Sequence, residues 1–318
     1  MAFEVLKNSH NHFLFLKEFG KKAALLMVLS TLVSSCAVLT KSQLQLVTNL
    51  TVASDSVSVT PVVIFDELAN VRTGRGLLYA ASLTSAAARK QEINALATAS
   101  ITDEQLVNRA DVYVSVLNSY LRALRSLSAD TRWKSYGTEW RGLGRNIDSL
   151  LLRVNQTELI ASEIPVGWAK LSGQYMGYLS ENFRRAQQAK TVKAFVTEGD
   201  TLVAACVDGL IELLRTGELD ELMRNESEGL TNNYEAYLYR LESSGQMPDL
   251  SVDREYITLV KRLEKAKQTR SRCVTALQSL RRAHHKLVKE LEKRKHADYL
   301  FEELLELNTL AIQLGASR

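Results

Sequence analysis

The stretch LVNRADVYVSVLNSYLRALRSL, residues 106–127, decides the fold class of this chain. Its apolar side chains recur at steps of three and four, the spacing that places them along one side of an α-helix. They are Leu106, Ala110, Tyr113, Leu117, Leu121, Leu124 and Leu127. Just before them, Thr102 and Gln105 have the spacing of a capping box and predict that the helix begins there. Because a one-sided apolar helix must bury that side, the stretch predicts a packed helical core.

Other parts of the chain repeat this spacing. They predict further helices over residues 77–96, 133–154, 171–186, 202–214 and 219–241. Asp130 is placed as the N-cap of the second of these, and Thr216-Gly217 as the stop between the last two. The three prolines, Pro61, Pro165 and Pro248, predict breaks, because the residue before a proline disfavours helix.

The composition agrees with a helical protein. Only three Pro and 15 Gly occur in 318 residues, which argues against a loop-rich β-sandwich and against a glycine-rich linker protein. We therefore predict an all-α fold, with an antiparallel helical bundle over residues 61–248.

The C-terminal part, residues 249–318, predicts one long helix. Residues 249–314 contain neither Pro nor Gly. With Tyr256 taken as the first position of a heptad, 12 of the 17 a and d positions are apolar, which favours a coiled-coil-like helix. We expect this helix to pack on the bundle or to mediate self-association or binding of a protein partner.

The same helix carries a strong local charge. Residues 254–295 contain 14 Lys and Arg against four Asp and Glu, although the whole chain has a formal net charge of only +4. Its dense end supplies candidate contacts to an anionic partner, namely Arg281, Arg282, Lys286, Lys289, Lys293, Arg294 and Lys295. The alternative is a solvated helix face whose Lys and Arg stems cover apolar surface. Nucleic acid is not expected as a partner, because the N-terminus predicts export.

The N-terminus has the pattern of an export signal. Lys21 and Lys22 precede an uncharged run over residues 23–33. The next residues, Val33-Ser34-Ser35-Cys36, resemble the lipobox of bacterial lipoproteins. This resemblance implies that residues 1–35 are removed as a signal peptide and that the thiol of Cys36 is acylated. Residues 36–60, rich in Ser, Thr and Val, are then expected to form a flexible tether between the lipid and the bundle.

The resemblance also predicts a location in the bacterial cell envelope. Ala37, rather than Asp, follows the cysteine, and by the sorting rule of enteric lipoproteins this favours the outer membrane, with the body facing the periplasm. The alternative is an uncleaved inner-membrane anchor over residues 23–40, an uncharged stretch of 18, with a periplasmic body.

Few residues suggest catalysis. Cys206 and Cys273 are candidates for a disulfide in an oxidising compartment, with buried thiols as the alternative. His284, His285 and His296 lie on the C-terminal helix, but the adjacent pair point about 100° apart and do not face one ion together, so no metal site is expected. Gly74-Arg75-Gly76 lacks the remaining glycine of a dinucleotide-binding loop, and no cofactor is expected.

These observations favour a non-enzymatic, membrane-anchored envelope lipoprotein. We expect it to act as a scaffold or docking partner through its helical surfaces and to contact the membrane through its lipid anchor. Two alternatives stay open. One is an envelope enzyme that acts on cell-wall polymer, and the other is a surface or periplasmic protein that blocks phage or toxin.

Overall fold

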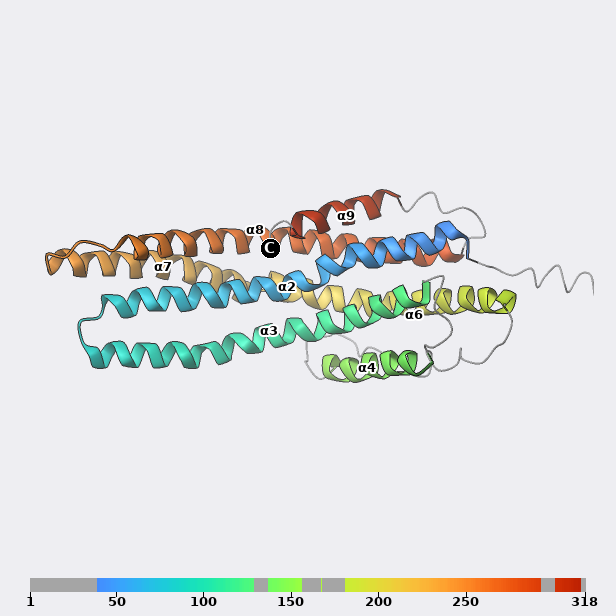
Figure 1. Cartoon of the computed structure of the whole chain (residues 1–318), viewed down its shortest axis with the longest axis horizontal. Helices are drawn as coiled ribbons and strands as arrows, with labels where there is room; N and C mark the ends of the chain where they lie inside the picture. Colours follow the sequence, from blue (N-terminus) through green and yellow to red (C-terminus); the bar gives the residue numbers. More distant parts are fainter. Residues whose placement is uncertain (1–38, 129–136, 156–166, 168–180, 293–300, 316–318) are drawn as a thin grey trace, which may run out of the picture.

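The computed structural model describes residues 39–128, 137–155, 167, 181–292 and 301–315. Within these residues every regular element is an α-helix, so the predicted all-α bundle is confirmed (Figure 1). The helices are α2 (Lys41–Ser82), α3 (Ala86–Ser128), α4 (Gly137–Asn155), α6 (Glu181–Arg215), α7 (Gly217–Ser243), α8 (Leu250–Glu292) and α9 (Phe301–Gly315).

The long helices lie roughly antiparallel and form an elongated rod (Figure 1). α2 packs against α3, α7, α8 and α9, while α6 lies between α3 and α8. The turn between α2 and α3 and the turn between α7 and α8 lie at the same end of the rod (Figure 1). We call this the turn end; it comprises residues 83–85, residues 244–249 and the helix ends that they join. α2 begins at the opposite end (Figure 1).

The core runs along the rod between these helices. The apolar side of residues 106–127 lies within it, and Tyr113, Leu117 and Leu124 have no solvent exposure. α2, α6 and α8 contribute Leu50, Leu210 and Leu277 to the same core, each completely buried. Because each buried Leu contributes about 1.5–3 kcal/mol relative to an exposed one, the helices are held together mainly by these apolar sides.

Helix boundaries around α3 differ from the prediction. The helix expected over residues 77–96 is interrupted, because α2 ends at Ser82 and α3 begins at Ala86. Ser85 accepts a hydrogen bond from the backbone N–H of Ala88, so a local N-cap fixes the second start. The start expected at Thr102 is also wrong, because α3 continues through that residue without a break. A spacing of three places two side chains on the same helix face inside a helix as well as at its beginning, so the capping-box pattern was not specific.

The expected tether is wrong for residues 41–60, which form the first half of α2. Thr40 caps the helix by accepting from the backbone N–H of Gln43 at 3.2 Å, and the Gln43 side chain accepts from the Thr40 N–H at 2.9 Å. Val47 and Val57 are completely buried. The polar composition was misleading because a hydroxyl inside a helix can donate its hydrogen bond to a backbone carbonyl one turn earlier, as the Ser54 hydroxyl does to Leu50.

Pro61 does not break the helix, since α2 runs from Lys41 to Ser82 through it. Proline removes one intrahelical hydrogen bond, but the burial of neighbours such as Ile64 and Phe65 holds the helix together. Pro248 does lie in the turn between α7 and α8, as predicted, and Pro165 lies outside the described residues.

α2 is also long and apolar enough to cross a membrane by length and composition alone. However, 56% of its most apolar window is buried inside the bundle, which is typical of a core helix.

The C-terminal part is not one helix. α8 ends at Glu292, and residues 301–315 form α9, which packs against both α8 and α2. The heptad pattern holds for α8, where Leu263, Leu280 and Leu287 are buried. α9 has its own apolar side, on which Leu304, Leu307 and Leu314 are buried. A straight continuation of α8 would not bring this side back against α8 and α2, so α9 has to run in a different direction from α8.

The break predicted at Thr216-Gly217 is confirmed. Thr216 is the N-cap of α7, and its hydroxyl accepts from the backbone N–H of Leu219 at 3.3 Å. α4 matches the helix predicted over residues 133–154 from Gly137 onward, and α6 matches the two predictions over residues 171–186 and 202–214 from Glu181 onward. Asp130, Trp133 and residues 171–180 lie outside the described residues, as does the whole signal sequence with Cys36.

Candidate functional site

Three of the four described cations at the basic end of α8 are paired within the molecule. Arg281 forms an ion pair with Asp208 of α6. Arg282 pairs with Glu306 at 3.0 Å, and Lys286 pairs with Glu303 at 2.6 Å. Both glutamates belong to α9, so these cations fasten α9 to α8.

Of the remaining cations of this end, the structure describes only Lys289. Lys289 is exposed, while Lys293, Arg294 and Lys295 lie outside the described residues. The hydrogen bond from Lys286 lowers the pKa of Glu303. The sequence did not reveal these pairs, because the carboxylates come from segments far away along the chain.

A buried polar cluster joins α3, α6 and α8. The Tyr120 hydroxyl and Nε2 of His284 are 2.7 Å apart, and Nδ1 of His284 lies 3.0 Å from Oδ1 of Asp200. Tyr120 and His284 have no solvent exposure. The Tyr120 ring stacks on Phe195 at a centroid distance of 5.3 Å.

His285 reaches the same carboxylate from outside. Its Nδ1 lies 2.7 Å from Oδ2 of Asp200, so the two adjacent histidines bind one carboxylate through its two oxygens. Burial raises the pKa of Asp200, but the hydrogen bonds from His284 and His285 outweigh that effect and lower it. Adjacent helical histidines do not face one ion together, but the two oxygens of a carboxylate offer them separate acceptors.

This cluster serves packing and alignment of the three helices. Burial, together with the charge on Asp200, raises the pKa of Tyr120 well above its usual value, so its hydroxyl stays protonated. Among the described residues, no group of three His, Cys, Asp or Glu is arranged to hold a metal ion.

The two cysteines are buried on α6 and α8, and no disulfide joins Cys206 to Cys273. The predicted candidate disulfide is therefore not formed in the structure, and the alternative of buried thiols describes it. Burial raises the pKa of Cys206 to about 12, which keeps its thiol protonated and unreactive.

A buried carboxylate fastens α7 to α2 and was not found from the sequence. Glu226 is 2% exposed and lies 3.0 Å from Nε of Arg72 and 2.7 Å from Nε of Arg75. Two cations beside one buried carboxylate supply the pairing that a buried charge requires. Arg75 belongs to the Gly74-Arg75-Gly76 segment, whose glycines lie close to Leu259 and Leu96, so this segment packs helices together and does not form a phosphate loop.

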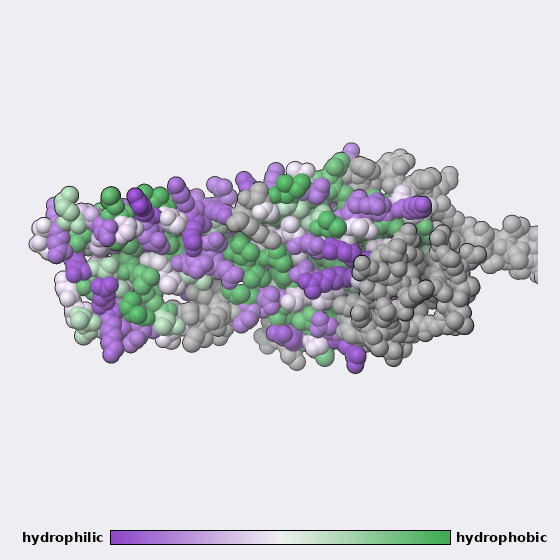
Figure 2. All heavy atoms as spheres, in the orientation of Figure 1, coloured by the Kyte–Doolittle hydropathy of each residue, from purple (hydrophilic) through white to green (hydrophobic). Residues whose placement is uncertain are grey.

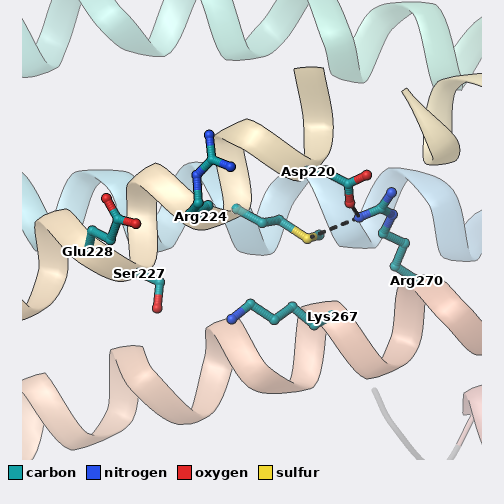
Figure 3. A pocket seen from close by; sticks show the side chains of 7 residues that line it. Asp220, Arg224, Ser227, Glu228, Lys267 and Arg270 are labelled. Atoms are coloured by element: carbon teal, nitrogen blue, oxygen red, sulfur yellow. Dashed lines mark hydrogen bonds and ion pairs between the residues drawn. The ribbon is translucent and has the colours of Figure 1, made fainter. Parts of the chain in front are cut away.

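An open cavity of about 450 Å³ lies between α7 and α8 (Figure 3). Two of its cations are paired with carboxylates: Arg270 with Asp220, which also lines the cavity, and Lys267 with Glu264 of α8 at 2.8 Å. The hydrogen bond from Arg270 lowers the pKa of Asp220. Ser227 supplies a hydroxyl, but no histidine lines the cavity to act as its base.

Exposed apolar side chains gather at the turn end. Of the 12 large apolar residues that are exposed in the described chain, eight lie within about 15 Å of helix length from its two turns. They are Leu77, Tyr79, Ile93, Tyr239, Met247, Leu250, Ile257 and Val260. Met247 is 89% exposed, Tyr239 73% and Leu250 69%. On the face seen in Figure 2, hydrophobic and hydrophilic residues are interspersed along the whole rod, including the turn end.

The turn end is well fixed despite its exposure. The Tyr234 hydroxyl donates to Asp253 at 2.7 Å and joins α7 to α8, which raises the pKa of Tyr234 to about 12. Tyr234 also stacks on Tyr256 at 4.0 Å. Arg240 donates to the backbone carbonyl of Ala81 and so ties α7 to the end of α2. These contacts hold the ends of α2, α7 and α8 together beneath the exposed apolar residues.

Comparison of the chain with protein-family models, with curated proteins and with solved structures finds no match.

Proposed function

We propose that this protein is a non-enzymatic envelope lipoprotein that holds a docking surface away from its membrane anchor and binds a protein partner there. The observation that carries the proposal is the gathering of eight exposed apolar residues at the turn end. Apolar side chains grouped on a surface lose contact with water when a partner covers them, and such groups mark interaction sites.

The arrangement of the rod supports this assignment. α2 has 42 residues and is therefore about 63 Å long at 1.5 Å per residue. Acylation of Cys36, five residues before α2, keeps the beginning of α2 close to the lipid. The turn end then lies a helix length away from the anchor, where a partner has access to it.

The alternative of an envelope enzyme has less support. The cavity between α7 and α8 is open, and its cations are paired with carboxylates. The histidines of the described chain are engaged with Asp200, and Cys206 is completely buried.

Docking is tested by placing a photo-crosslinking residue at Met247 in the full-length, membrane-bound protein. We expect one cross-linked product of defined mass. The matched control carries the same residue at Val52, which is 55% exposed but lies on the other half of the rod. The variant Tyr239→Ser with Leu250→Ser is expected to remove the Met247 product. Identical products from Met247 and Val52 would contradict the proposal.

The lipid anchor is tested separately with Cys36→Ser. We expect the variant to leave the membrane fraction and to lose the mass of the acyl chains. A variant that stays fully membrane-bound with no change in mass would show that the lipobox assignment is wrong.

A further inference from the structure

The outward side of α8 at the turn end carries an ordered line of side chains. Leu250, Arg254, Ile257, Lys261 and Lys265 follow one another at steps of four, three, four and four. This spacing places them along one side of the helix. All five are exposed, whereas Leu259, Leu263 and Ala266 on the other side are buried in the bundle. We call these five residues the outer line.

The three cations of the outer line have no ion-pair partner in the part of the chain that the structure describes. Their neighbours on α8 do, since Arg262 pairs with Glu67, and Lys267 and Arg270 pair with Glu264 and Asp220. Arg254, Lys261 and Lys265 thus present positive charge to the solvent over about 17 Å of helix.

Apolar residues alternate with these charges. Leu250 is 69% exposed and Ile257 is 50% exposed, and both are followed four residues later by a cation. Met247, next to the beginning of α8, extends the apolar part into the turn. A partner that covers this line must offer apolar side chains and negative charge at the same helical spacing.

We infer that the partner is an acidic amphipathic helix that lies along the outer line of α8. Leucine-like side chains of the partner would cover Leu250 and Ile257, while its Asp or Glu residues would pair with the three cations. Opposite charges increase the association rate and fix the register of such a contact. A narrow line that follows the axis of one helix suits a second helix better than it suits a broad anionic membrane surface. This inference rests on the proposed docking function and specifies the chemistry of its partner.

The test uses the purified full-length protein and a synthetic 20-residue peptide of Leu and Glu, with Leu at steps of three and four. A second peptide has Gln in place of every Glu. We expect the Glu peptide to bind at least about 10-fold more tightly, measured by fluorescence anisotropy, because each ion pair adds to the attraction. High salt should remove most of this difference. Equal binding of the two peptides would overturn the inference.

A pair of matched variants locates the contact. Arg254→Gln, Lys261→Gln and Lys265→Gln together are expected to weaken binding of the Glu peptide at least about 10-fold. The control replaces Lys41, Arg122 and Lys190 with Gln; these are three exposed cations away from the turn end, and their replacement removes the same charge. Equal losses in the two variants would overturn the inference. Binding to phosphatidylglycerol vesicles that depends on the outer line, without binding of the peptide, would replace it with a membrane contact.

The cross-link at Met247 separates this inference from the function on which it rests. We expect the triple variant of the outer line to reduce the yield of that cross-link at least about fivefold. If the cross-link persists unchanged, docking stands and the acidic chemistry is wrong. If wild-type protein gives no cross-link at all, the docking function itself fails.

Discussion

The two halves of α8 carry similar net charge but differ in how many of their cations form ion pairs within the molecule. In the second half, Arg281, Arg282 and Lys286 are paired with carboxylates of α6 and α9. In the first half, Arg262, Lys267 and Arg270 are paired too, but three further cations face solvent without an ion pair among the described residues, namely Arg254, Lys261 and Lys265. A dense run of basic residues in the sequence therefore does not identify the cations that are free to bind a partner, because carboxylates on neighbouring helices pair with some of them.

The largest expected effect concerns the two sides of α8. Leu277 is completely buried and Leu250 is 69% exposed. Leu277→Ala is expected to lower the free energy of unfolding by about 2–5 kcal/mol, because it removes core contacts and leaves a cavity. Leu250→Ala is expected to change it by less than about 0.5 kcal/mol. Urea unfolding followed by circular dichroism measures both, and equal losses would contradict the orientation of α8.

The next effect concerns the cluster that aligns the second half of α8. Asp200→Asn is expected to lower the free energy of unfolding at neutral pH by about 1–3 kcal/mol, because it weakens the hydrogen bonds to His284 and His285. The folded-state pKa of Asp200 is lowered, so its contribution is present above the unfolded pKa and is lost as pH falls through the folded pKa.

The difference between wild type and Asp200→Asn should therefore shrink as the pH falls below about 4. Unfolding curves measured over a series of pH values test this expectation. A difference that stays constant down to the lowest pH would show that the charge of Asp200 contributes nothing.

A smaller effect is expected for the ion pair that holds α9 to α8. A double-mutant cycle of Lys286→Gln and Glu303→Gln should give a coupling of about 0.2–1 kcal/mol, because both side chains are partly exposed. Lys286→Gln should also raise the pKa of Glu303 toward its ordinary value, which a nuclear magnetic resonance titration measures. An unchanged Glu303 pKa would show that the pair does not persist in solution.

The smallest effect on stability is expected in the first half of α8. Lys261→Gln should change the free energy of unfolding by less than about 0.5 kcal/mol, because its exposed side chain forms no ion pair within the described part of the chain. Thermal unfolding measures this. A loss as large as that of Leu277→Ala would mean that the first half of α8 is as closely packed as the second.

Much of the fold could be predicted from the sequence. The steps of three and four in residues 106–127 gave the buried side of α3, and the heptad positions gave the buried side of α8. Thr216 marked a real helix boundary. The turn at residues 83–85 and the end of α8 at Glu292 were missed, because the end of a helix depends on where two apolar sides meet in space as well as on the local residues.

The candidate site was predicted less well. The apolar residues of the turn end are scattered over three parts of the sequence, around residues 77, 93 and 250, and only the two turns bring them together. Asp200 lies 84 residues from His284, and no pattern along the chain connects them. Local spacing reports which side of one helix is apolar, and it contains no information on which other helix faces it.

The sequence by itself determined that this chain forms helices and which side of most helices is buried, since periodicity follows from the geometry of a single helix. The tertiary structure alone shows that residues 41–60 belong to the core, that α9 packs on α8, and that Arg281, Arg282 and Lys286 are paired with carboxylates. Each of these depends on contacts between segments far apart in the chain. Such contacts contribute free energy only when the helices pack together, so no local pattern in the sequence reports them.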